Sequence, residues 1–265
     1  MKHIGPHSAT FTSALYAELR HDLLAGAWQP GARLPIKKIC ERYQVSLSPV
    51  REALSRLAAE GFLVQTDHRG FRVAGISKED LSDLTRVRCE INDLALRDAI
   101  ELGSEVWTEG IVLAFHRLSR VPRFDSESTP RLNPEWDLHH REFHSSLVAG
   151  SASSRLREYC DRLFDQTERY RGLAAVLNLK ETKMRAATEH KDIMDATLDR
   201  NAEQATALMR SHLERTSQKL LDNWDLLESR HDGSEGPGNQ LSPSAIEIRS
   251  ARGMSPRPGA DSDRR

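Results

Sequence analysis

The chain has 265 residues, of which 38% are hydrophobic and 29% are charged, with a formal net charge of −1 at pH 7. This length allows one large domain or two ordinary ones, since domains run roughly 100–200 residues. The apolar runs are too short to cross a bilayer, and residues 1–6 lack the apolar stretch of a secretory signal. We therefore expect a cytoplasmic protein without membrane contact. The three cysteines lie far apart, which excludes a disulfide framework and a cysteine-rich zinc module: Cys40, Cys89 and Cys160.

Both ends of the chain have the composition of unfolded segments. Residues 229–265 are rich in Gly, Pro and Ser and contain few large apolar side chains. Such a segment cannot bury enough surface to offset the entropy lost on ordering. We predict a disordered tail over 229–265 and a flexible leader over 1–9.

Residues 10–75 have the element order of a winged helix-turn-helix. Apolar residues recur at helical spacing in a first helix that ends near Gly26, and a second helix is predicted over 35–43. A third helix begins at Val45-Ser46, with Ser46 or Ser48 as its N-cap. Two short strands, 62–64 and 71–73, flank a hairpin turn over 67–70. Three helices followed by a hairpin predict a DNA-binding unit.

The charge of this unit is modest, with nine Lys or Arg against six Asp or Glu. Several of the basic residues lie where such a unit meets DNA: Lys38 on the second helix, Arg51 on the third and Arg69 in the hairpin. The start of the recognition helix contacts base edges, while neighbouring groups such as Ser46 and Ser48 bind phosphate oxygens. Charge alone would favour a simpler interpretation, a solvated helical face.

Residues 77–228 predict an all-helical antiparallel bundle of about six helices, so the whole chain is mainly α. Ser77 and Asp80 form a capping pattern before a long amphipathic helix. Strand-like alternation is not sustained anywhere in this region. Further helices are predicted at about 104–120, 134–149, 153–178, 180–199 and 201–227.

Four histidines have spacings that favour a shared site. His140 and His144 project from the same face of one helix. His190 and His212 lie equally far on either side of a helix break at Arg200-Asn201, so antiparallel helices carry them to the same height. Helical bundles build metal sites in their interior, and neutral imidazole suits Zn, Ni, Cu or Fe(II). Histidines that only form hydrogen bonds or pack in the core are the alternative, and spacing alone does not decide between them.

Residues 14–73 resemble the N-terminal domain of the GntR family of bacterial transcription regulators. The matching stretches are Leu15-Tyr16, Gly26–Leu34, Val45–Leu54, Leu57–Gly61 and Arg69–Val73. The resemblance implies operator contacts from Lys38, Ser48, Arg51, His68, Arg69 and Gly70. One departure is Leu47, since the family usually has an arginine there. A guanidinium contact to guanine is therefore absent at this position, and an apolar contact to a thymine methyl is expected to replace it.

Residues 79–225 resemble the FCD effector domain of the FadR subfamily. The stretches that match this domain are Asp80-Leu81, Val87-Arg88, Phe143-His144 with Leu147, Glu189–Ile193, Ala202–Ala205 and Met209–Leu213. Many members bind a divalent metal through an aspartate and three histidines. His144, His190 and His212 match the histidines, whereas His140 stands in the place of the aspartate. Asp137, one turn earlier, is a possible substitute for that carboxylate.

The same resemblance implies a small organic acid as effector. Arg88 is the expected carboxylate clamp, because a guanidinium binds a carboxylate through two parallel hydrogen bonds. A salt bridge on the bundle surface is an equally good interpretation of Arg88. Asn92 stands four residues later, where the family usually has a glutamate, and we place it in the same effector site.

Together these features predict a homodimeric, ligand-responsive transcription regulator, a repressor, that binds double-stranded operator DNA and a divalent transition metal such as Zn or Ni. The alternative is a metal-dependent hydrolase that uses the four histidines. The glutamate of His140-Arg-Glu-Phe-His144 is at the wrong offset for an HExxH zinc-protease helix, and the sequence lacks a nucleophile elbow and a Walker loop. An enzyme is therefore not expected. A purely structural metal is a third hypothesis.

Overall fold

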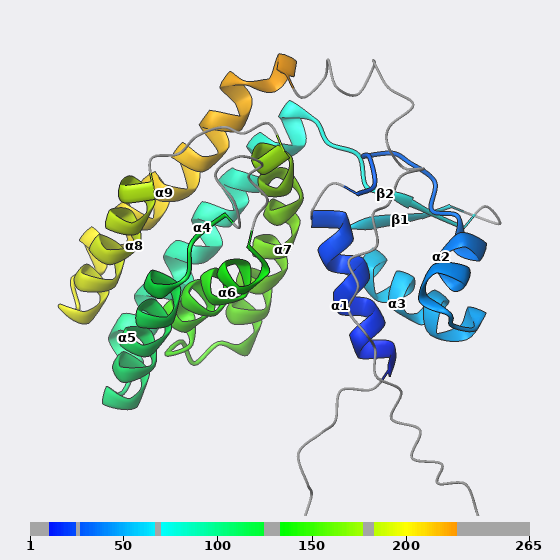
Figure 1. The fold of residues 1–265 in the computed structure, drawn as a ribbon. Coiled ribbons are helices and arrows are strands. Elements are labelled where there is room, and N and C mark those ends of the chain that lie inside the picture. The colour runs from blue at the N-terminus through cyan, green and yellow to red at the C-terminus, as the bar shows by residue number, and fades with distance from the viewer. Residues whose placement is uncertain (1–10, 25–26, 67–69, 125–132, 177–182, 227–265) are drawn as a thin grey trace, which may run out of the picture.

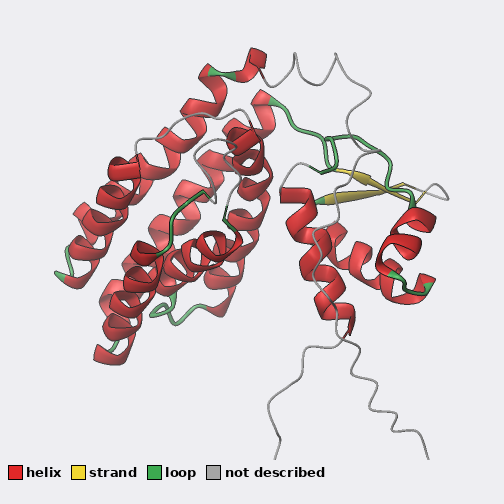
Figure 2. Cartoon of the chain, in the orientation of Figure 1, coloured by secondary structure: helices red, strands yellow, loops and turns green. Residues whose placement is uncertain are grey.

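The computed structural model describes residues 11–24, 27–66, 70–124, 133–176 and 183–226. Within these ranges a small unit of three helices and a hairpin lies beside a larger all-helical unit (Figures 1 and 2). The predicted mainly helical fold is thus confirmed. The predicted leader, 1–9, and tail, 229–265, lie outside the described residues.

The N-terminal unit is a winged helix-turn-helix, as predicted. It contains α1 (Phe11–Leu24), α2 (Ile36–Tyr43), α3 (Leu47–Ala59), β1 (Leu63–Thr66) and β2 (Gly70–Val73). The strands pair antiparallel, with Leu63 opposite Val73 and Thr66 opposite Gly70. Apolar residues of all five elements form one core, and the face of α3 that enters it is Val50, Ala53, Leu54 and Leu57.

Local backbone conformation sets the boundaries of these elements. Gln44 ends α2 in the left-handed conformation, with φ +53°, and its N–H bonds back to the helix. Gly61, with φ +84°, follows the end of α3, and Gly70, with φ +89°, begins β2. A residue with a side chain would be strained at these two positions, which explains the glycines. Ser46 is the N-cap residue of α3 by backbone conformation, but its side chain makes no capping hydrogen bond.

The helical unit contains α4 (Lys78–Leu102), α5 (Glu105–Arg120), α6 (Pro134–Val148), α7 (Ser154–Val176), α8 (Lys183–Leu198) and α9 (Ala202–Asp222). The long α4 packs against α7 and α9, while α5 packs on α6 and α8 on α9. The predicted cap is confirmed, because Ser77 Oγ accepts a 3.0 Å hydrogen bond from the Asp80 N–H. Among the described residues no helix is long and apolar enough to cross a membrane.

The two units meet along one edge of each. In Figure 1, α1 stands between α7 and the rest of the N-terminal unit. A short connection from Ala74 to Ser77 then leads from β2 into α4. The two units are therefore joined by the contact of α1 with α7 as well as by the connecting segment.

The packing of α3 gives a direct test of the N-terminal core. Leu54 is fully buried, whereas Leu47 on the same helix is 49% exposed. Leu54→Ala is expected to lower the free energy of unfolding by about 2–5 kcal/mol, because it leaves a cavity in the core. Leu47→Ala removes the same atoms from a solvated position and is expected to change the free energy of unfolding by roughly 0.5 kcal/mol or less. Urea unfolding followed by circular dichroism measures both, and equal effects would contradict this packing.

Candidate metal centre and DNA-binding face

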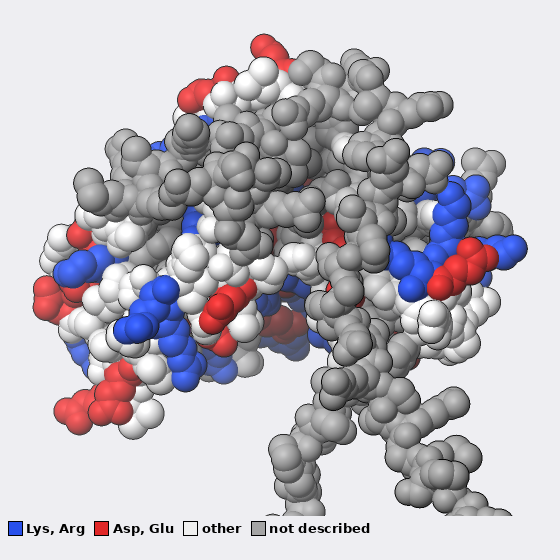
Figure 3. Space-filling view, viewed as in Figure 1, with Lys and Arg blue, Asp and Glu red and all other residues white. Residues whose placement is uncertain are grey.

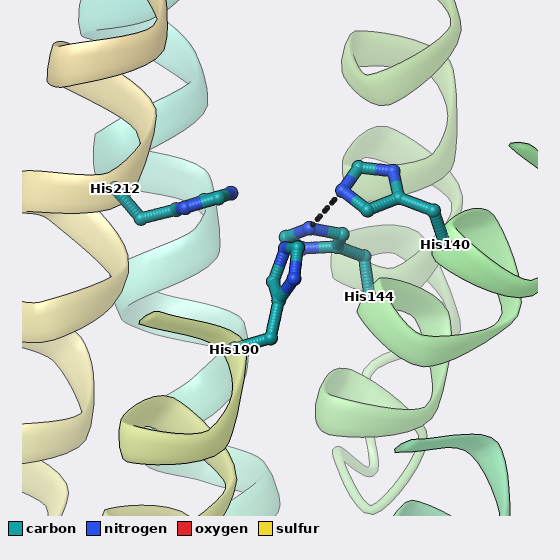
Figure 4. Close-up of side chains that lie close together, drawn as sticks. All are labelled: His140, His144, His190 and His212. Carbon is teal, nitrogen blue, oxygen red and sulfur yellow. Dashed lines mark hydrogen bonds between the residues drawn. The ribbon is translucent and has the colours of Figure 1, made fainter. Parts of the chain in front are cut away.

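The structure brings the four histidines together in the interior of the helical unit. His140 and His144 come from α6, His190 from α8 and His212 from α9, and their rings converge on one point (Figure 4). One potential ligand atom of each lies within 4.8 Å of those of the others. The Nε2 atoms of His140 and His144 are 3.1 Å apart. These two residues and His190 are 3–6% exposed, and the His212 side chain is 11% exposed.

Neighbouring side chains hold the rings in place. Nδ1 of His212 lies 2.9 Å from Oε2 of Glu189, whose other oxygen contacts Arg215 on α9. A carboxylate on the second nitrogen is the usual device for orienting a histidine that binds a metal. Trp136 stacks on His140, with ring centroids 4.5 Å apart. Phe143 is fully buried, with its ring centroid 5.4 Å from that of His190.

Asp137 does not substitute for the missing aspartate. In the described residues the grouped ligand atoms are those of the four histidines, without Asp137. Its carboxylate lies instead toward the N-terminal unit, with Oδ2 3.7 Å from Arg20 Nη1. Helical spacing alone would allow Asp137 on the face of the histidines, since it lies one turn before His140. Its contact with Arg20 on α1 is a tertiary one that the spacing does not predict.

Arg88 is buried, so its interpretation as a surface salt bridge is wrong. It is 6% exposed, and its guanidinium carbon lies 5.0 Å from the centroid of the Phe164 ring. Phe164 is in turn 5.5 Å from the rings of His140 and His144. Arg88 and the histidine cluster are thus neighbours across one aromatic ring. Asn92 is also buried, and its Nδ2 donates to the Arg88 carbonyl at 2.9 Å.

The residues predicted to contact DNA occupy the solvated side of the N-terminal unit. Lys38 on α2 and Ser46, Ser48 and Arg51 at the start of α3 are all exposed, and Gly70 begins β2. Basic side chains gather over α2 and the hairpin on the right of Figure 3. His68 and Arg69 lie outside the described residues. The exposed start of α3 is accessible to a DNA groove, because its opposite face fills the core.

Two neighbours of the cluster were not predicted. Glu189 precedes His190 in the sequence, and its place beside His212 follows only once α8 and α9 are paired. Phe164 lies on α7 between Arg88 and the histidines, and nothing in its local sequence distinguishes it from an ordinary core residue. The break at residue 200 could have indicated Glu189, because pairing α8 with α9 about it brings this residue beside His212.

Comparisons with known proteins agree with this architecture. Residues 11–73 match the family described as "Bacterial regulatory proteins, gntR family", and residues 83–215 match the FCD domain. The chain is 32% identical over 201 residues to the HTH-type transcriptional repressor GlaR of Escherichia coli, covering 75% of this chain and 90% of GlaR. It is 34% identical over 201 residues to the HTH-type transcriptional regulator BphR of Paraburkholderia xenovorans, covering 76% of this chain and 81% of BphR.

A solved structure shares the fold. E. coli McbR/YncC superposes with a TM-score of 0.66 at 21% identity, over 82% of this chain and the whole of McbR. The family matches cover both the winged helix-turn-helix and the helical unit, and two relatives exceed 30% identity over most of their length. The chain therefore belongs to the GntR family of DNA-binding transcription regulators and carries an FCD effector domain.

Proposed function

We propose that this protein is a homodimeric repressor whose FCD domain binds a divalent transition metal and a small organic acid. The observation that carries the proposal is the buried group of four imidazoles, with ligand atoms within 4.8 Å of one another, in the domain that follows a DNA-binding unit. We place the DNA-binding domain at 10–75 and the effector domain at 77–228. The relative GlaR is named as a transcriptional repressor, which supports repression rather than activation.

The donor set fits a metal such as Zn or Ni. Four neutral nitrogen ligands from His140, His144, His190 and His212 suit borderline transition metals better than Mg or Ca, which prefer oxygen. Glu189 would hold the His212 ring in its orientation. When bound, the metal would supply a positive charge in a buried site, which attracts an anionic ligand.

An organic acid would then bind beside the metal, with Arg88 as the clamp for its carboxylate. The guanidinium of Arg88 lies against Phe164, the ring that also borders His140 and His144. A carboxylate in this position would be bound by the planar fork of arginine and attracted by the metal charge. Asn92, one turn further along α4, would add a polar group beside Arg88.

Binding of two DNA-binding domains to one operator requires a dimer. Helix-turn-helix dimers read two half-sites of a near-palindrome, and the spacing of the two domains must match that of the half-sites. An effector lowers operator affinity only if it binds more tightly to a dimer in which the spacing of the two DNA-binding domains differs from that of the half-sites. The hydrolase hypothesis lacks comparable support, since GlaR and BphR are both named as transcription regulators.

The metal is tested by mass spectrometry of the purified protein. Wild type incubated with Zn²⁺ or Ni²⁺ is expected to retain about one metal per chain, and His190→Ala/His212→Ala to lose it. His139→Ala is the matched control, because His139 lies on α6 beside the cluster but has Nδ1 2.9 Å from Glu142. It is expected to keep the metal. Wild type without metal after incubation would overturn the proposed site.

The stabilising effect of the metal is a second readout. Zn²⁺ at a hundred times its Kd is expected to raise the free energy of unfolding by about 2.7 kcal/mol in wild type and not in the double variant. A structural metal predicts a further result, that chelation melts the helical domain. A sensor site instead predicts that the chelated protein stays folded and loses only its response to the organic acid.

Operator binding is tested at Arg51, on a DNA fragment that wild type selects from a random pool. Arg51→Ala is expected to weaken binding by about 1–3 kcal/mol, or roughly 5- to 150-fold in Kd, because the side chain is exposed at the start of the recognition helix. Arg86→Ala removes the same charge from an exposed position on α4 and is expected to bind as wild type. Fluorescence anisotropy at fixed salt measures both. Equal Kd values for all three proteins would contradict the assigned DNA face.

Leu47 is expected to alter which base is preferred. Its side chain is 49% exposed at the first position of α3. Leu47→Arg is expected to gain about 1–3 kcal/mol of preference for guanine at one operator position, where wild type favours thymine. Selection from a random DNA pool with each protein reveals the preferred bases. Identical selected sites would show that residue 47 does not contact a base.

A further inference from the structure

One arginine of the DNA-binding domain reaches into the effector domain. Arg20 lies on α1, and its Nη2 donates a 2.9 Å hydrogen bond to Asp165 Oδ1 on α7. Its Nη1 is 3.7 Å from Asp137 Oδ2 on α6. The three side chains are largely buried, with exposed fractions of 17% for Arg20, 14% for Asp137 and 9% for Asp165. This contact joins residues 145 positions apart in the sequence.

The environment of Arg20 favours its charged form. Burial lowers the pKa of the guanidinium, but the attraction of Asp165 and Asp137 outweighs burial and leaves the pKa raised. The ring of Phe62, in the DNA-binding domain, lies 5.4 Å from the guanidinium carbon. Arg20 is thus held by an aromatic ring of its own domain and by two carboxylates of the other.

The carboxylates that receive Arg20 lie directly beside the histidine cluster. On α6, His140 and His144 form one stripe, and Asp137 and Arg141 form the adjacent stripe. On α7, Phe164 borders the two histidine rings, and the next residue, Asp165, binds both Arg20 and Arg141. On α6 the histidines and Asp137 thus lie on neighbouring stripes, and on α7 Phe164 lies against the histidines while the next residue, Asp165, contacts α1.

Other described residues also join the two domains at this junction. Gln166 of α7 lies near Gly61, where an added Cβ would be 3.3 Å from its side chain. Arg169 donates to the Gly75 carbonyl in the connecting segment and to Asp80. A groove lined by Leu24, Trp28, Phe62 and Ile76 opens between these contacts.

We propose that Arg20 is the positioning residue that docks the DNA-binding domain on α6 and α7 and transmits occupancy of the histidine cluster to α1. The transmission part rests on the proposed metal site, whereas the docking part does not. A ligand at the histidines shifts α6 relative to α7 and thereby moves the two carboxylates that hold Arg20. The orientation of the DNA-binding domain changes with them.

Hydrogen–deuterium exchange of the full chain tests both parts. Without metal, Arg20→Gln and Asp165→Asn are each expected to speed exchange in residues 11–24 about tenfold, within the range of coupling found for contacting charged side chains. Arg20→Lys keeps the charge but loses the two-pronged donor, so it is expected to restore part of the protection. Arg97→Gln is the matched control, since both carboxylate partners of Arg97, Asp93 and Glu203, lie within the effector domain. It is expected to leave residues 11–24 unchanged.

The same measurement with Zn²⁺ tests transmission. In wild type, Zn²⁺ is expected to slow exchange in α6 and α9 and also to change it in α1. In Arg20→Gln the change in α6 and α9 remains and that in α1 disappears. Unchanged α1 exchange without metal, in both Arg20→Gln and Asp165→Asn, would overturn the docking role. A Zn²⁺ response of α1 that persists in Arg20→Gln would overturn transmission. If Zn²⁺ slows exchange in no part of the wild-type effector domain, the proposed metal site fails and transmission with it, while the metal-free comparison still decides docking.

Discussion

The burial of four imidazole rings in one helical domain constrains the structure around them. Polar groups in an apolar interior cost free energy unless they have hydrogen-bonding or coordinating partners. The rings of His140 and His144 contact each other, and Glu189 contacts His212. These contacts fix the register of α6, α8 and α9, because a helix rotated by one residue would carry its histidine away from the group. The cluster therefore acts together with the apolar core in setting how the three helices pack.

Helices α6 and α7, which lie at the cluster, also contact the DNA-binding domain. A guanidinium and two carboxylates that are largely removed from water stabilise the junction while they stay together, since Arg20 separated from both carboxylates would be a largely buried charge. This makes the junction between α1 and the α6–α7 pair sensitive to small displacements.

Stability and the proposed DNA recognition are divided between the two faces of α3. Val50, Leu54 and Leu57 are buried and hold the helix in the core, while Ser48 and Arg51 are exposed. Residues on the exposed face can change without loss of the fold, because they contribute little to packing. Leu47 is such a change relative to the arginine usual in this family.

The sequence by itself determined the element order, the N-cap of α4 and the shared face of His140 and His144. Leucine spacing predicted α1 and α3, Ser77 and Asp80 predicted the start of α4, and the break at residue 200 predicted that His190 and His212 meet. Only the tertiary structure decided that Asp137 lies toward Arg20, that Arg88 is buried against Phe164, and that Asp165 binds an arginine 145 residues away. The physical reason is that helical periodicity fixes which residues share a face, whereas the rotation and packing of distant helices decide what that face meets.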